Sequence, residues 1–210
     1  MDYIYRILKK ELKVICYNKK VFITTIISEL IIFFLIAYSR NLFEPFGFHS
    51  IEFVMNLAIV TFVCQLLPQS YFCDKETGVD KLLVLAKKFR IVCLVRIILY
   101  SFIMFFQLVL VSSIFLLCFE MNIFSSNIYM FYYFMNYILI SVFDMIIMLI
   151  TDDKSVSMYI SFIFIIPYIL FSSYLFNSLN LQVVFLILFF LLLFCSLLLN
   201  LLIKKMHKVY

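Results

Sequence analysis

Glycine and histidine are scarce in this sequence, and their scarcity excludes several kinds of site. Gly47 and Gly78 are the only glycines among 210 residues, whereas a P-loop needs two glycines followed by a lysine at fixed spacing, and a Rossmann fingerprint needs more. The histidines, His49 and His207, belong to no HExxH motif, and no GxSxG motif occurs. The chain is therefore predicted to be no enzyme by itself and to hold no cofactor, so any ATP and magnesium would be bound by another chain.

No two cysteines form a CxxC pair, the spacing typical of redox and metal sites. Most of them stand within or beside apolar runs, where a free cysteine behaves as a small hydrophobic residue. We therefore predict buried thiols, with neither a metal site nor disulfide bonds, for Cys16, Cys64, Cys73, Cys93, Cys118 and Cys195.

Charge is also sparse, because 14% of the residues are charged and 66% are hydrophobic. A mean hydropathy of +1.14 lies far above that of soluble domains, so most of the surface must face lipid. Uninterrupted apolar runs of about 20 residues select helices over a β-barrel. The sequence predicts an all-α membrane domain over 21–210, preceded by a helix over 1–20, with six spans at about 21–38, 53–69, 91–115, 128–150, 156–176 and 183–203.

The positive charges fall almost entirely on one side of these spans. Of the 17 lysines and arginines, only Arg40 lies in a loop on the other side. The positive-inside rule then predicts a multi-pass protein of the cell membrane with both termini in the cytoplasm. The net charge of +5 reflects this topology and anionic lipid head groups rather than binding to nucleic acid.

The first 20 residues are charged throughout and lack the apolar core of a signal peptide. They form instead an amphipathic pattern, with Ile4, Leu8, Leu12 and Ile15 on one stripe and Arg6, Lys9, Lys10 and Lys13 on the other side. This pattern predicts a helix in the cytoplasmic interface of the membrane, with its lysines on lipid phosphates. The alternative is a solvated leader.

The segment 72–90, between the second and third spans, concentrates charge in an otherwise apolar chain. Beyond Gly78, which is suited to a turn with positive φ, Val79, Leu82 and Leu83 recur at helical spacing beside charged residues. A short helix with one apolar stripe is suited to docking in a groove of a partner. The alternative is a loop that only supplies cytoplasmic positive charge.

These features resemble the permease subunit of an ABC-2-type transporter. The resemblance covers the amphipathic N-terminal helix, the six spans, the long second-to-third connection and its Glu76, Gly78, Leu82 and Leu83. The chain departs from the family pattern at Val79, where threonine is usual, at Lys87, where proline is common, and at Arg96, which is near the expected basic position. The "IIPYIL" stretch around Pro167 resembles small haem-exporter-type and peptide-exporting members.

The resemblance implies a transport cycle driven by another protein. Two permeases, identical or paired with a relative, would dock on two ABC ATP-binding subunits and export a hydrophobic or amphipathic substrate, such as a peptide or bacteriocin, a drug or a lipid-linked molecule. The implied coupling surface comprises Glu76, Gly78, Asp80, Lys81, Leu82 and Leu83.

Two acids lie inside predicted spans, Glu29 in the first and Asp144 in the fourth. At 1.5 Å per residue each lies about 10–12 Å from the cytoplasmic face. Burying a charge there is costly, so each needs a partner, and Arg96 is the evident cation. The acids either line a substrate path, or carry protons in an ion-coupled transporter, or lock helix packing. A non-transporting membrane partner or immunity protein is a further alternative.

Aromatic residues crowd the predicted outer end of the fourth span, in "IYMFYYFMNY" over 128–137. Such a cluster is typical of an interfacial belt. The alternative is an aromatic lining along which an amphipathic chain passes.

Overall fold

The computed structural model of the protein describes residues 2–17, 23, 27, 31, 48–119 and 127–209. Within these residues the fold is all-α, as predicted, and has no strand. The helices are α1 (Asp2–Tyr17), α4 (Phe48–Glu76), α5 (Val79–Leu85), α6 (Phe89–Phe119), α7 (Asn127–Ile150), α8 (Lys154–Ser178) and α9 (Leu181–Val209).

Five of the described helices, α4 and α6 to α9, are long and apolar enough to cross a membrane. They coincide with five of the six predicted spans and indicate a membrane protein. The observed helices extend the predicted spans at one or both ends, most of all α4, which continues past 69 to Glu76. Most of the first predicted span, 21–38, lies outside the described residues, and so do Glu29 and Arg40.

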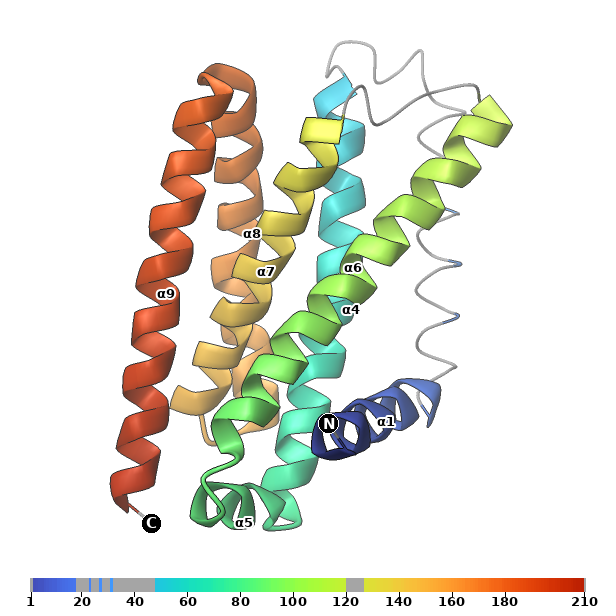
Figure 1. Ribbon diagram of the computed structural model, residues 1–210. Coiled ribbons are helices and arrows are strands. Elements are labelled where there is room, and N and C mark those ends of the chain that lie inside the picture. The colour runs from blue at the N-terminus through green and yellow to red at the C-terminus, as the bar shows by residue number, and fades with distance from the viewer. Residues whose placement is uncertain are drawn as a thin grey trace.

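The bundle is built around α7, which packs against α4, α6, α8 and α9. In Figure 1 the five long helices run side by side, while α1 lies across the foot of the bundle and contacts α6 and α4. The core contains Tyr100, Met104 and Leu108 of α6 packed with residues of α7. Cys64, Cys93 and Cys195 are buried as predicted, whereas Cys16 and Cys73 are exposed.

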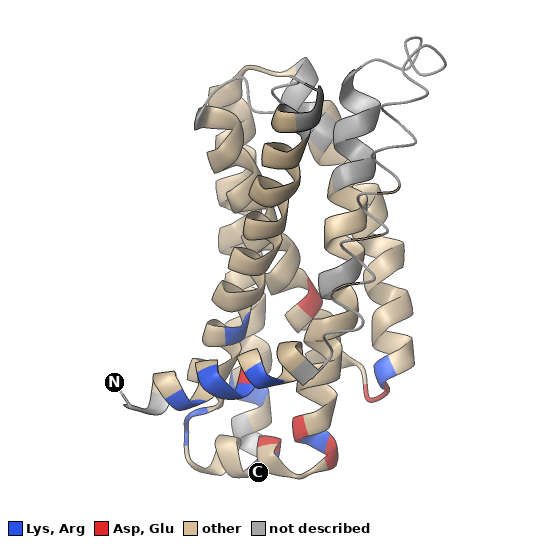
Figure 2. Ribbon diagram, turned by 90° about the vertical axis from the view of Figure 1, so that its right-hand side faces the viewer, with Lys and Arg blue, Asp and Glu red and all other residues tan. Residues whose placement is uncertain are grey.

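Both ends of the chain lie at the same end of the bundle as α1 and α5 (Figure 1). Figure 2 shows that the charged residues of the described part gather there, while the rest of the bundle carries almost none. We call this the charged end, formed by α1, α5 and the turn 151–153. Large apolar side chains such as Phe189, Phe190 and Phe194 of α9 are exposed along the uncharged length, as expected for contact with lipid.

The short helix α5 is held between two left-handed residues. Gly78 precedes it with φ 71°, which confirms the predicted positive φ. Lys87 follows it with φ 54°, and its N–H donates to the Val84 carbonyl at 2.9 Å while the Lys88 N–H donates to that of Leu83 at 2.9 Å. These two bonds form a Schellman motif. Proline, common here in the family that the sequence resembles, has a fixed negative φ and no N–H to donate.

We predict that Gly78→Ala lowers the free energy of unfolding by about 1–2 kcal/mol, the cost of a left-handed alanine. A Cβ at Gly78 would meet no atom within 4 Å, so this cost is conformational rather than steric. Thermal unfolding of the purified protein in detergent would measure it. Gly78→Asn should lose less, since asparagine tolerates this region. An alanine variant as stable as the parent protein would contradict the left-handed turn.

Candidate functional site

Three helices bring charged side chains together inside the charged end. Glu11 comes from α1, Asp74 from α4 and Arg96 from α6, and their exposed fractions are 0%, 3% and 1%. On α1, Glu11 lies one turn after the buried Ile7, so the two form the face that α1 turns toward the bundle. With Ser70 of α4, these residues form what we call the ionic cluster.

Arg96 is at the centre of the ionic cluster. Its Nε donates to Glu11 Oε1 at 2.9 Å, and its Nη2 donates to Asp74 Oδ2 at 2.6 Å. The same Nη2 lies 3.1 Å from Ser70 Oγ and 3.3 Å from the Ser70 carbonyl oxygen. Ser70 Oγ in turn donates to Glu11 Oε2 at 2.5 Å. One guanidinium therefore connects α6 to both α1 and α4.

The charges of the ionic cluster are balanced at its edge. Lys10 of α1 forms an ion pair with the second oxygen of Asp74, and Tyr100 OH donates to Glu11 Oε2 at 3.4 Å. Two carboxylates thus face one guanidinium and one ammonium. Because buried charges are tolerated only when paired and hydrogen-bonded, the arrangement fixes the position of α1 against α4 and α6.

Arg96 does not pair with Asp144, the partner that the sequence suggested for it. Both ion pairs of Arg96 in the described residues are made with Glu11 and Asp74. Asp144 instead accepts a hydrogen bond from Ser161 of α8, and its Oδ2 has no hydrogen-bond partner in the described part of the chain. Glu29, the other predicted acid, lies outside the described residues.

Little in the sequence indicated a role for Glu11 or Ser70. Glu11 is surrounded by lysines and falls outside the apolar stripe that was expected to face the membrane interface. In the structure Ile4 and Leu12 of that stripe are exposed, while Ile7 and Glu11 are buried. The spacing of Ile7 and Glu11, one helical turn apart, was the available signal.

The six residues of the predicted coupling surface separate into two faces. Glu76 ends α4 and is exposed, as are Lys81 and Leu82 on α5. Leu83 is half-buried against the core, and Gly78 is the turn residue before the helix. Asp80 departs from the prediction, because it is 4% exposed and shares the inward face of α5 with the buried Val84, four residues later.

A leucine that the sequence interpretation omitted completes the outward face of α5. Leu82 and Leu85 are 65% and 64% exposed and lie three residues apart, on one side of the helix. Lys81 is exposed beside them. We call Lys81, Leu82 and Leu85 the outer face of α5.

The turn between α7 and α8 is joined to α4 at the charged end. Lys75 donates to Asp152 Oδ1 at 2.8 Å, and its ammonium lies 5.5 Å from the centre of the Phe72 ring. The hydrogen bond and the positive charge of Lys75 lower the pKa of Asp152. The pair is solvent-exposed, so it orients the turn rather than adding much stability.

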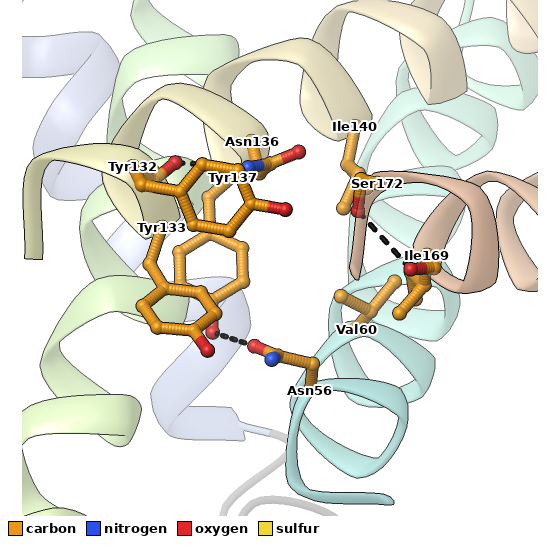
Figure 3. A pocket seen from close by; sticks show the side chains of 9 residues that line it. All are labelled: Asn56, Val60, Tyr132, Tyr133, Asn136, Tyr137, Ile140, Ile169 and Ser172. Carbon is orange, nitrogen blue, oxygen red and sulfur yellow. Dashed lines mark hydrogen bonds between the residues drawn. The ribbon is translucent and has the colours of Figure 1, made fainter. Parts of the chain in front are cut away.

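A second polar region lies in the half of the bundle away from the charged end. Figure 3 shows side chains of α4, α7 and α8 converging on a cavity of about 10 Å³, little more than the space for one water. Tyr137 OH donates to Asn56 Oδ1 at 2.7 Å, and Tyr168 OH donates to Asn136 Oδ1. Tyr132, Tyr133 and Tyr137 are buried here, so they form no interfacial belt.

Comparison with protein-family models, with curated proteins and with solved structures finds no match to the chain.

We predict that Arg96→Gln lowers stability by about 3–5 kcal/mol, because it leaves Glu11 and Asp74 buried without their cation. Thermal unfolding in detergent would show a large drop in the midpoint. Arg96→Lys should be intermediate, since one ammonium cannot replace the planar fork of the guanidinium.

Arg90→Gln is the matched control, because Arg90 is exposed in the first turn of the same helix. This change should cost at most about 0.5 kcal/mol. Equal midpoints for the two glutamine variants would show that the ionic cluster does not hold the three helices together.

Proposed function

We propose that the chain is the permease subunit of an ABC-2-type transporter and moves a hydrophobic or amphipathic substrate when a separate ABC ATP-binding subunit hydrolyses ATP. The observation that supports this proposal best is the outer face of α5. It presents Leu82 and Leu85 away from the bundle, on a helix that packs against α4, α6 and α9. Exposed leucines on a short helix beyond the ends of the apolar spans are suited to a groove on a partner protein.

The proposed mechanism begins with pressure of the ATP-binding subunit on α5. The buried Val84 and the two left-handed turns limit the freedom of α5 to move by itself. Displacement of α5 therefore pulls on the ends of α4 and α6. Because Asp74 and Arg96 lie near those ends, α1 moves with them through Glu11.

The charged end faces the cytoplasm in this proposal, as the positive-inside rule requires. The basic residues of α1 then meet anionic head groups, while the exposed Ile4 and Leu12 enter the lipid interface. A sixth span over 21–38 and a second copy of the permease, or a related chain, complete the transporter. ATP and magnesium are bound by the ATP-binding subunits.

In this proposal the substrate path is inferred from the chemistry of the side chains inside the bundle. The tyrosine and asparagine side chains of Figure 3 offer apolar ring faces with hydrogen-bonding groups, which suits an amphipathic cargo such as a peptide, a drug or a lipid-linked molecule. The cavity of about 10 Å³ is too small for such a cargo, so transport requires α4, α7 and α8 to separate.

We predict that Leu82→Asp abolishes co-purification of the ATP-binding subunit and substrate-stimulated ATP hydrolysis. A carboxylate at this exposed position would have to be desolvated in the partner's groove. The measurement is pull-down of the full chain with its partner, followed by an ATPase assay in lipid nanodiscs. The free permease should unfold at the parent temperature, because Leu82 is not part of the core.

Ser155→Asp provides the control for added charge. Ser155 is exposed at the charged end but belongs to the first turn of α8, not to α5. This variant should bind the partner normally. If Leu82→Asp also leaves binding and ATP hydrolysis unchanged, the docking role of α5 is wrong.

A second candidate function is an ion-coupled carrier, and the environment of Asp144 favours it. The side chain is fully buried and has no cation within the described residues, and one of its oxygens is unpaired. A carboxyl group in this setting is expected to bind a proton or a cation.

Under this second function, Asp144→Asn would abolish substrate movement driven by an ion gradient in proteoliposomes that contain no ATP. Under the ABC function the same variant would keep its ATP-driven transport, and the parent protein would move nothing without ATP. Ser161→Ala, which removes the hydrogen bond to Asp144, should weaken gradient-driven transport only partly.

A further inference from the structure

A polar cavity of about 520 Å³ opens at the charged end on the inward side of α5. Its walls come from the ends of α4, α7 and α9, from Asp80 of α5 and from Asp152 of the turn 151–153. This volume falls within the range of roughly 300–1,000 Å³ that is typical of small-molecule sites. None of the functions considered above uses this cavity.

One carboxylate oxygen of a residue that lines the cavity has no hydrogen-bond partner in the described part of the chain. Asp80 lines the cavity, is 4% exposed, and its Oδ1 makes no hydrogen bond within the described residues. The nearby Lys75 already pairs with Asp152. Because a buried carboxylate oxygen without a partner is unfavourable, this position is suited to a ligand that carries a cation.

The other walls of the cavity indicate what else the ligand carries. Lys205 of α9 lines the same cavity and is exposed, so it offers a cation to an anionic group. Ile150 and Leu202 supply apolar surface beside it. No cluster of three or more metal-ligating side chains occurs among the described residues, which argues against a metal ion.

The position of the cavity identifies the source of such a ligand. Ile150 is the last residue of one candidate span and Met206 the last of another, and both line the cavity. The cavity therefore lies at the level where the apolar segments end, which is the depth of phospholipid head groups. The outer face of α5 points away from it, so a protein docked there would not fill it.

We propose that this cavity binds the head group of a phospholipid with a primary amine, of the phosphatidylethanolamine class. The ammonium donates to Asp80, the phosphate lies against Lys205, and the first acyl carbons follow Ile150 and Leu202. A trimethylammonium group has no N–H to donate to Asp80, so phosphatidylcholine binds less well. The proposal requires only that the chain lies in a membrane, and it does not depend on an ATP-binding partner.

Native mass spectrometry of the full chain tests this proposal. The detergent-purified protein is mixed with phosphatidylethanolamine, phosphatidylcholine and phosphatidylglycerol of identical acyl chains, and retained lipids are counted. We expect preferential retention of phosphatidylethanolamine. Asp80→Asn should reduce this preference at least about tenfold, the effect of losing one charge-assisted hydrogen bond. Lys205→Gln should reduce retention of all three lipids.

Two control variants remove the same charges outside the cavity. Asp153→Asn keeps a side chain able to cap α8, where Asp153 Oδ1 accepts the Ser155 N–H at 2.7 Å. Lys204→Gln changes the exposed neighbour of Lys205. Both should retain lipid as the parent protein does. Size-exclusion elution and the unfolding midpoint of each variant verify that it is folded.

Three results would overturn the proposal. One is equal retention of the three lipids by the parent protein. Another is an unchanged preference for phosphatidylethanolamine in a folded Asp80→Asn variant. The third is a co-purifying protein that is lost in Asp80→Asn while lipid retention stays the same, since a polypeptide would then occupy the cavity.

Discussion

The arrangement of the charged end depends on the ion pairs that the Arg96 guanidinium forms with Glu11 and Asp74. Arg96 lies 85 residues from Glu11 and 22 from Asp74 along the chain, yet contacts both inside the protein. Once these charges have left water, none of the three can be separated from the others without a large free-energy penalty. The helices α1, α4 and α6 are therefore coupled by electrostatics, in addition to the contact of apolar surfaces.

A helix as short as α5 also has a defined orientation, for reasons separate from the ionic cluster. Seven residues form too short a helix to be stable alone in water. One left-handed residue lies at each end of α5, and the buried Val84 anchors the helix in the core. Its outward side is left free to carry leucines, and its inward side carries Asp80 over a cavity. One short element thus separates a surface suited to a protein from a site suited to a small charged ligand.

Polar groups inside the bundle are distributed unevenly along its length. The ionic cluster lies at the charged end, and the tyrosine–asparagine region lies in the opposite half. Between the two, the core of α6 and α7 is mostly apolar, with Asp144 as a buried acid. Hydrogen bonds between helices are retained in lipid because no water competes for the groups. The ionic cluster can therefore fix α1, α4 and α6 against one another, and the tyrosine–asparagine region can fix α4, α7 and α8. The outer surfaces of α8 and α9 remain apolar.

Local sequence determined the helices of this protein, because apolar runs of spanning length and a glycine that permits positive φ act within one element. The class of fold, five spans, α5 and the turn at Gly78 were accessible in this way. Tertiary structure alone decided that Arg96 binds Glu11 and Asp74 rather than Asp144, that Asp80 faces inward, and that Tyr132, Tyr133 and Tyr137 are buried. These outcomes depend on how each helix is rotated about its axis and on which helices become its neighbours. The sequence periodicity of a single helix specifies neither the rotation nor the neighbours.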